Sequence, residues 1–510
     1  MRWLKAAGRL VAVCAAVKLA LHLYAGRAYG YFVDELYYLA CAEHLAWGYV
    51  DQPPLVALLA RIVRTVLGDS LRAIRLLPAI AGAGKVLLAG LLARELGGGP
   101  AAQGLAALCV LAAPGFLATD HFLSMNAFEP LFWLGCAYIV LRIVKSSATG
   151  DATNLPRLWL AFGLLAGLGL ENKHSMLIFG FALVVGLLLT PQRAVLWSPW
   201  SLAGGALALL LFLPNLVWNI QQHFPFLEIQ ANIRASGRNA ALSPLGFFKD
   251  EILAMQPLAL PVWLAGLWFF FADSAGKAHR WLGWTWVVAA AVIVAANPRI
   301  YYLFPAYPLL FAGGAVLLER WLASRVFLVY AAAIAITGAL LAPIALPLLP
   351  VPSFLAYSAA LHLNQPSIEN HEMGPLPQLF ADQFGWEQMA ATVAKAFQAL
   401  PPQVRARTAI FGQNYGQAGA IDLFGPKYGL PKAISGHQNY FLWGPRDYDG
   451  DNMLVLDGRE EVLHTLFQHV EKAGTVYHPY SMPYQHFDIY YCSGAKTPLR
   501  QLWPGLKRWG

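Results

Sequence analysis

The chain has 510 residues, of which 58% are hydrophobic and 13% are charged, and its mean hydropathy is +0.49. Soluble domains carry about 25% charged residues, so this composition excludes an ordinary soluble protein and indicates an integral membrane protein. The net charge is +8, but the basic residues are scattered between apolar stretches, which argues against a nucleic-acid partner. The five cysteines form no CxxC pair, so neither a disulfide framework nor a cysteine metal site is predicted.

Apolar stretches that suit membrane helices recur along residues 1–349. A helix needs about 20 apolar residues to cross the hydrocarbon core, so we predict about eleven spans. The spans are 8–25, 73–93, 101–118, 127–145, 158–171, 175–190, 199–218, 256–273, 282–297, 302–319 and 326–349. Basic residues precede the first span, as in a signal peptide, but no convincing cleavage site follows it, so an uncleaved anchor is predicted.

The basic residues divide the connections between these spans into two sets. By the positive-inside rule, the turns rich in Lys and Arg are cytoplasmic, and so is the N-terminus. These turns contain Arg94, Arg142, Lys145, Arg157, Arg193, Lys277, Arg280, Arg320 and Arg325. The turns TDHFLS, ENKHS and NPRIYY and the longer segments 26–72 and 219–255 then lie at the outer face. An odd number of spans also places the C-terminus outside.

The first outer segment is dense in polar and aromatic residues, and we predict two helices in it that lie along the membrane surface, at 34–46 and 54–67. The second follows Pro53-Pro54, and proline suits a first helical turn. The segment 219–255 has a similar mixture of apolar and polar residues, which is typical of helices at a membrane interface.

From about residue 350 the composition changes to that of a small α/β domain, and we predict two domains, 1–349 and 350–510. Strands are predicted at 408–411, 452–456 and 486–492, and helices at 386–399, 415–424, 459–468 and 498–508. Within this exported domain, Asn414, Tyr415, His437 and Asn439 form a polar, glycine-rich group that lines a pocket or builds a turn.

Ionisable and aromatic residues of the membrane part gather at the predicted outer ends of the spans. A transporter would be expected to place acids and bases near the midplane, where polar groups are costly. Their place here favours an enzyme that works at the outer interface. The residues are Asp34, Glu35, Asp120, His121, Asn126, Glu129, Glu171, Lys173, His174, His223, Arg299, Tyr301 and Tyr302.

Several of these residues lie in motifs that resemble a known family. DELYY followed by WGYVDQPPL resembles the GT-C polyprenyl-phosphate-sugar glycosyltransferases of glycosyltransferase family 39. These include protein O-mannosyltransferases, aminoarabinose lipid A transferases and rhizobial lipid A galacturonosyltransferases. The resemblance covers roughly 25–320 and extends to GQNYGQAGAIDLFGPKYG near the C-terminus. It implies a GT-C membrane fold and sugar transfer from a polyprenyl-phosphate donor to a lipid A, other glycolipid or protein acceptor. The site would lie at the periplasmic face of the bacterial inner membrane.

The resemblance also implies roles for individual residues. Asp34 matches the acid that takes a proton from the acceptor hydroxyl, and Glu35 stands beside it. Lys173 and Arg299 occupy positions of basic residues that would hold the lipid phosphate, with Tyr301 and Tyr302 orienting the phosphate or sugar. Asn126 replaces an acid that the family often carries, so Glu129 or Asp120 would substitute for it. A divalent cation would assist, with Glu35, His174 and His223 as candidate ligands, and no nucleotide cofactor is expected.

Structural interpretations stand beside these functional ones. Asp34 suits a helix N-cap, Glu35 suits a structural role as well as a functional one, and Lys173 and Arg299 suit anchors that snorkel from a span end. Tyr301 and Tyr302 suit an aromatic belt. For the whole chain, a transporter or flippase of lipid-linked sugars and a membrane-anchored glycan-binding protein are the alternatives.

Overall fold

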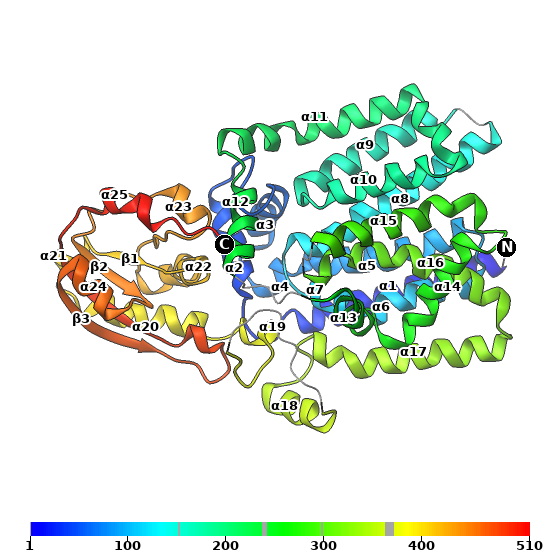
Figure 1. Cartoon of the computed structure of the whole chain (residues 1–510). Coiled ribbons are helices and arrows are strands. Elements are labelled where there is room, and N and C mark those ends of the chain that lie inside the picture. Colours follow the sequence, from blue (N-terminus) through cyan, green and yellow to red (C-terminus); the bar gives the residue numbers. More distant parts are fainter. Residues whose placement is uncertain (1, 151–152, 237–241, 297–298, 363–371) are drawn as a thin grey trace.

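The computed structural model describes residues 2–150, 153–236, 242–296, 299–362 and 372–510. Within these ranges, long helices form a bundle, and a small sheet with its own helices lies beside one end of it (Figure 1). The N-terminus lies at the opposite end of the bundle, and the C-terminus lies at the junction between the two parts (Figure 1).

Seven helices in the described ranges are long and apolar enough to cross a membrane, and two bent helix pairs raise this number to nine. The bent pairs turn by 119° and 103° at their breaks. The chain is therefore a multi-pass membrane protein. The helices that form these spans are α1 (Arg2–Ala25), α4 (Leu71–Ile74) with α5 (Leu76–Glu95), α8 (Met125–Thr149), α10 (Met176–Leu188) with η1 (Pro191–Trp197), α11 (Pro199–Gln221), α13 (Pro244–Ala254) with η2 (Pro257–Ala259) and α14 (Leu260–Phe271), η3 (Lys277–His279) with α15 (Arg280–Ala296), η4 (Ile300–Tyr302) and η5 (Phe304–Ala306) with α16 (Tyr307–Trp321), and α17 (Ser324–Ala345).

A helix forms at each of the eleven predicted stretches, and in the described ranges nine of them have the length and apolar composition of a span when each bent pair counts as one. The stretch 101–118 is divided into α6 (Pro100–Ala112), which has 13 residues, and α7 (Pro114–Thr119). Pro114 begins the second piece because proline lacks the N–H that would continue the first. The stretch 158–171 forms α9 (Leu155–Asn172), which is not among the seven helices apolar enough to cross. The span predicted to end at 297 reaches Ala296, and residue 297 lies outside the described ranges.

The apolar core of the bundle depends on close contact between helices. Gly266 in α14 and Gly314 in α16 lie against the backbone of the partner helix, where a Cβ would collide with the carbonyl oxygens of Leu310 and Val262. Small residues allow this approach, which brings van der Waals contact in the absence of a hydrophobic driving force in lipid. The contact fixes α16 and the turn that precedes it, Ile300–Tyr302.

Both helices predicted in the first outer segment form, as α2 (Val33–Glu43) and α3 (Leu55–Leu67), and their place along the membrane surface stays a prediction. Helix α3 buries Val56 and Val63 on one side and exposes Leu58, Ile62 and Val66 on the other. A helix with an exposed apolar face beside a bundle of membrane helices is suited to lie in the lipid interface. In the second outer segment, α12 (Pro225–Ser236) lies near α2 and α3 (Figure 1).

The C-terminal part contains a four-stranded sheet in the order β1-β2-β4-β3. Strand β1 (Ala409–Phe411) is parallel to β2 (Asn452–Leu456), whereas β4 (Phe487–Ala495) is antiparallel to both β2 and β3 (Phe467–Val476). The three predicted strands are confirmed. The helices around the sheet are α20 (Trp386–Ala399), α21 (Pro402–Arg405), α22 (Tyr415–Phe424), α23 (Asn439–Trp443) and α24 (Glu460–Leu466), and α18 (Val351–Ala360) and α19 (Gln378–Ala381) precede it.

Two predictions in this part are wrong. Strand β3 was not expected, because its sequence FQHVEKAGTV is mostly polar and lies at the edge of the sheet, where one face and one side meet solvent. The helix predicted at 498–508 is instead two short pieces, α25 (Leu499–Leu502) and η8 (Trp503–Leu506). Pro504 follows the break and cannot donate the hydrogen bond that a continuous helix would need.

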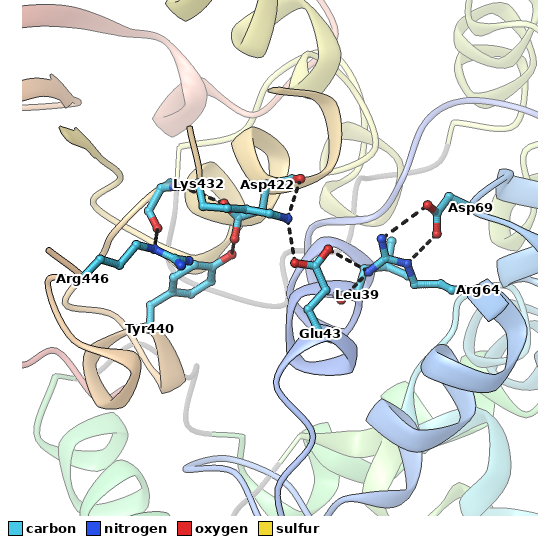
Figure 2. Close-up of polar contacts among 9 residues, drawn as sticks. Leu39, Glu43, Arg64, Asp69, Asp422, Lys432, Tyr440 and Arg446 are labelled. Carbon is cyan, nitrogen blue, oxygen red and sulfur yellow. Dashed lines mark hydrogen bonds and ion pairs between the residues drawn. The ribbon is translucent and has the colours of Figure 1, made fainter. Parts of the chain in front are cut away.

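The C-terminal part is docked on the first outer segment. Helix α22 packs along α2, and residues of both helices belong to one buried apolar cluster that includes Leu36, Ala418 and Ile421. Figure 2 shows an ion-pair chain beside this contact, in which Lys432 Nζ lies 2.7 Å from Glu43 Oε2 and Arg64 lies 3.1 Å from Glu43 Oε1. The division at 349/350 stays a prediction, because the two parts share this core and residues 363–371 lie outside the described ranges.

Candidate active site

Asp34 lies in the first turn of α2 with its side chain half-buried. The N-cap position of this helix belongs to Phe32, so Asp34 is not the capping residue that one interpretation of the sequence suggested. The Tyr415 hydroxyl of the C-terminal part donates a hydrogen bond to Asp34 Oδ1 at 2.7 Å. The position of the carboxylate is therefore set by α2, which carries it, and by the C-terminal part, which donates a hydrogen bond to it.

Glu35, the neighbouring acid, is fully buried and surrounded by donors. Arg75 donates from Nε to Oε1 at 3.1 Å and from its terminal nitrogen to Oε2 at 2.8 Å. The backbone N–H groups of Phe32 and Leu123 donate to the same carboxylate at 2.9 and 3.0 Å. Through these bonds Glu35 joins α2 to the second outer turn, which is a structural role. Its carboxylate is thus occupied by Arg75 and by backbone donors, in contrast to the predicted catalytic and metal-binding roles.

Lys173 is the centre of a second polar group, formed by the start of α8 and the turns that precede α10 and α16. Its Nζ donates to Asn126 Oδ1 at 2.9 Å and to Glu129 Oε2 at 2.8 Å, and it lies 4.0 Å from the ring centre of Tyr302. Tyr301 stacks on Tyr302 with ring centres 5.0 Å apart. The structure therefore brings together Lys173, Asn126, Glu129, Tyr301 and Tyr302, and Lys173 is buried among them instead of reaching along a lipid-facing surface.

Arg299 is half-buried and directly precedes the turn Ile300–Tyr302, where it takes the N-cap position. Its guanidinium lies close enough to Tyr302 for the two to interact electrostatically. Arg299 therefore belongs to the edge of the group around Lys173.

Tyr38 connects the Asp34 carboxylate to the group around Lys173. It lies one helical turn after Asp34, so the two side chains share a face of α2. Burial raises the pKa of Tyr38 well above its ordinary value, and the charges of Asp34 and Asp51 and the hydroxyl of Tyr301 add to this rise. Tyr38 therefore lies within electrostatic range of both Asp34 and Tyr301.

Asp51 is a further acid within electrostatic range of Tyr38. Tyr37 donates a hydrogen bond to its Oδ1 at 2.9 Å, and burial nevertheless raises the pKa of Asp51 from 3.8 to about 7. Between these two pH values the folded protein keeps a proton that the unfolded chain releases, so the free energy of unfolding falls as the pH rises from about 4 to about 7.

Replacing Asp51 with Asn should remove this part of the pH dependence. We expect the variant to match the wild type near pH 4 and to melt at a higher temperature at pH 8, because the amide never becomes charged in its buried place. Thermal melting in detergent between pH 4 and pH 8 measures this, with the exposed Asp447→Asn as the matched control. A pH-independent difference between Asp51→Asn and the wild type would contradict the expectation.

Asp120 is fully buried. It forms ion pairs with Lys85 and, at 2.9 Å, with Lys18, and these lysines come from α5 and α1. The predicted role of Asp120 in substrate binding is therefore replaced by a structural one, in which it compensates two charges inside the bundle. His121, the next residue, is also buried and lies 3.1 Å from Arg75.

The proposed metal ligands are not assembled. His174 interacts with Asn215 Oδ1 at 3.1 Å and packs against Phe226, His223 is exposed, and Glu35 is bound to Arg75. In the part of the chain that the structure describes, no three His, Cys, Asp or Glu side chains lie together in a way that could hold a metal ion. The residues present therefore do not fit the divalent cation that the sequence suggested.

Comparison with known proteins agrees with this arrangement. Residues 51–218 match the family model for dolichyl-phosphate-mannose-protein mannosyltransferase. Lipid A galacturonosyltransferase RgtD of Rhizobium johnstonii is 28% identical over 258 residues, which are 48% of this chain and 50% of that protein. The chain thus matches this curated relative over about half of the relative's length.

Among solved structures, ArnT from Cupriavidus metallidurans bound to undecaprenyl phosphate is similar over 94% of this chain and 97% of ArnT, with a TM-score of 0.60 and 15% identity. The same protein in the apo state gives the same values. This chain has the GT-C fold. The fold predicted from DELYY and WGYVDQPPL is thereby confirmed, together with the small C-terminal sheet that accompanies the GT-C helices here.

The sequence revealed the two acids and two tyrosines of the candidate site to different degrees. Asp34 was predicted, and Tyr38 was recognisable as part of the same DELYY motif, four residues on. Asp51 stands in WGYVDQPPL, but the motif assigned no role to it. Tyr415 was noted only in a polar group of the exported domain, because nothing in the local sequence shows that it meets Asp34.

Proposed function

We propose that this chain is a membrane glycosyltransferase that moves a sugar from a polyprenyl-phosphate donor to a hydroxyl acceptor at the outer face. The observation that carries the proposal is that loops far apart in sequence fix an acid, Asp34, and a buried cation, Lys173, both within electrostatic range of groups around Tyr38. The similarity to a lipid A galacturonosyltransferase and to ArnT bound to undecaprenyl phosphate supports this donor and a glycolipid acceptor.

Asp34 is the general base in this proposal. Its carboxylate takes the proton of the acceptor hydroxyl as the oxygen attacks the anomeric carbon. The bond from that carbon to the phosphate oxygen breaks, and the polyprenyl phosphate leaves with the electron pair. Attack from the face opposite to the phosphate inverts the anomeric configuration.

Lys173 and Arg299 stabilise the leaving phosphate. An ammonium group has three N–H donors, of which Asn126 and Glu129 accept two, so the third can be directed at a phosphate oxygen. Tyr301 and Tyr302 cover Lys173 and exclude water, which strengthens the electrostatic interaction with the phosphate.

No step in this mechanism is assigned to a metal ion or to a nucleotide. The sugar is already activated by its phosphate linkage, so donors fixed before the reaction are sufficient to bind the charge that develops. We place the protein in the bacterial inner membrane, with the N-terminus in the cytoplasm and the C-terminal part in the periplasm, because the basic turns lie at the end of the bundle away from Asp34.

Arg299→Ala tests the assignment of the phosphate site. A hydrogen bond to a charged group contributes about 1.5–3 kcal/mol, so the KM for the polyprenyl-phosphate sugar should rise by about tenfold to hundredfold. Initial rates of transfer in membranes, measured against donor and acceptor concentration separately, give the two KM values. The matched control is Arg325→Ala, an exposed arginine at the cytoplasmic end of α17. A rise in the acceptor KM alone would contradict the assignment.

A further inference from the structure

The hydrogen bond from Tyr415 to Asp34 crosses from the C-terminal part to the first outer segment. Its length, 2.7 Å from oxygen to oxygen, is typical of a well-formed O–H···O bond. Tyr415 is the first residue of α22, and Asn414 caps that helix by accepting a hydrogen bond from the backbone of Gln417 at 2.9 Å. The start of α22 is therefore fixed locally, and Tyr415 is fixed with it.

The Tyr415 ring is held on both faces. It stacks on His437 with ring centres 4.9 Å apart and planes inclined by 6°, and it lies 4.8 Å from the ring of Tyr37. The backbone N–H of Tyr415 also donates to His437 Nδ1 at 3.1 Å. A tyrosine packed in this way can present its hydroxyl in one direction only, toward α2.

The contact around Tyr415 is extensive enough to keep the hydroxyl in place. Gly419, one turn further along α22, lies so close to α2 that a Cβ would be 2.9 Å from the backbone of Leu36. Asn439 Oδ1 accepts a hydrogen bond from the Val50 N–H at 2.7 Å, next to Asp51. At the other end of α22, Asp422 accepts from Tyr440, and Lys432 reaches across to Glu43 (Figure 2).

We propose that the C-terminal domain completes the active site and that Tyr415 is a positioning residue for the Asp34 carboxylate. This inference rests on the proposed function. A hydrogen bond to one carboxylate oxygen fixes the plane of the group, and so fixes the direction in which the carboxylate meets an acceptor hydroxyl. The bond also stabilises the charged form of the carboxylate, which is the form that accepts a proton. The exported domain is then part of the catalytic unit instead of an accessory that binds glycans by itself.

Tyr415→Phe in the full-length protein tests this inference, because it removes one hydroxyl and keeps the ring that packs between His437 and Tyr37. We expect kcat for sugar transfer to fall by about tenfold to hundredfold with an unchanged donor KM. We also expect the acidic limb of the pH–rate profile to move to higher pH, because the carboxylate loses a donor that stabilises its charge. The matched control is Tyr477→Phe, an exposed tyrosine of the same domain, which should leave rate and profile unchanged.

The outcomes separate this inference from the proposed function. If Asp34→Asn is inactive while Tyr415→Phe has the wild-type rate and pH profile, the base assignment stands and the role of Tyr415 is refuted. A loss of rate for Tyr415→Phe that only matches its loss of folded protein in thermal melting, with an unmoved acidic limb, would show that the hydroxyl only stabilises the fold, and would also refute it. If Asp34→Asn retains the wild-type rate, both proposals fail together.

Discussion

Asp34→Asn should lower the rate of sugar transfer by about 100-fold to 10,000-fold, which is the range that a positioned general base contributes. The amide has nearly the shape of the carboxylate and can still accept the hydrogen bond from Tyr415, so folding should be preserved. It cannot take a proton from the acceptor, so the loss should appear in kcat. Transfer of a labelled sugar in membranes measures the rate, and thermal melting in detergent measures the fold.

The control for Asp34→Asn is Asp447→Asn, which makes the same chemical change at an exposed position of the C-terminal part. Binding of undecaprenyl phosphate to the purified Asp34 variant should be unchanged, since the phosphate is assigned to Lys173 and Arg299. A rate within a fewfold of the wild type would remove Asp34 from the mechanism.

Lys173→Met should lower both the stability of the fold and the rate of sugar transfer, and a second substitution separates these two effects. Glu129 is buried and loses its partner, and breaking a buried ion pair from one side costs about 3–5 kcal/mol of folding free energy. Transfer should also fall, because one donor to the leaving phosphate is gone. The double variant Lys173→Met/Glu129→Gln neutralises the orphaned acid, so it should recover most of the stability while transfer stays low.

Thermal melting and donor-dependent transfer rates of the two variants measure these effects. The comparison variant is Lys427→Met, whose ion pair with Glu387 is more than half exposed and is expected to contribute about 0–1 kcal/mol. If the double variant recovers both stability and the wild-type rate, Lys173 is purely structural and the phosphate is held elsewhere.

The sequence predicted the parts of the fold that depend on local pattern. The Pro53-Pro54 signal and the apolar periodicity after it correctly placed α3, and apolar runs located a helix at every predicted span. Two of these helices are less apolar or shorter than an ordinary span, because Pro114 divides the stretch after α6 and α9 carries polar residues at its ends. Strand β3 has too few apolar residues to be recognised without its neighbour β4.

The site could be predicted as a group but not residue by residue. The segregation of ionisable residues to one end of the spans correctly brought Lys173, Asn126, Glu129 and Tyr302 together. An acid has a structural role when it meets a partner from another helix. The sequence does not reveal these partners. Asp120 meets Lys18 and Lys85 inside the bundle, and Tyr415 reaches Asp34 across 381 positions of the chain.

The most direct test of the account uses the purified full-length protein in phospholipid vesicles, with an undecaprenyl-phosphate-linked sugar and an envelope glycolipid extract. We predict that free undecaprenyl phosphate appears in a one-to-one ratio with glycosylated lipid and that Asp34→Asn stops both. Movement of the donor between the two leaflets with its sugar–phosphate bond intact, and with no glycosylated product, would contradict the account and identify a flippase.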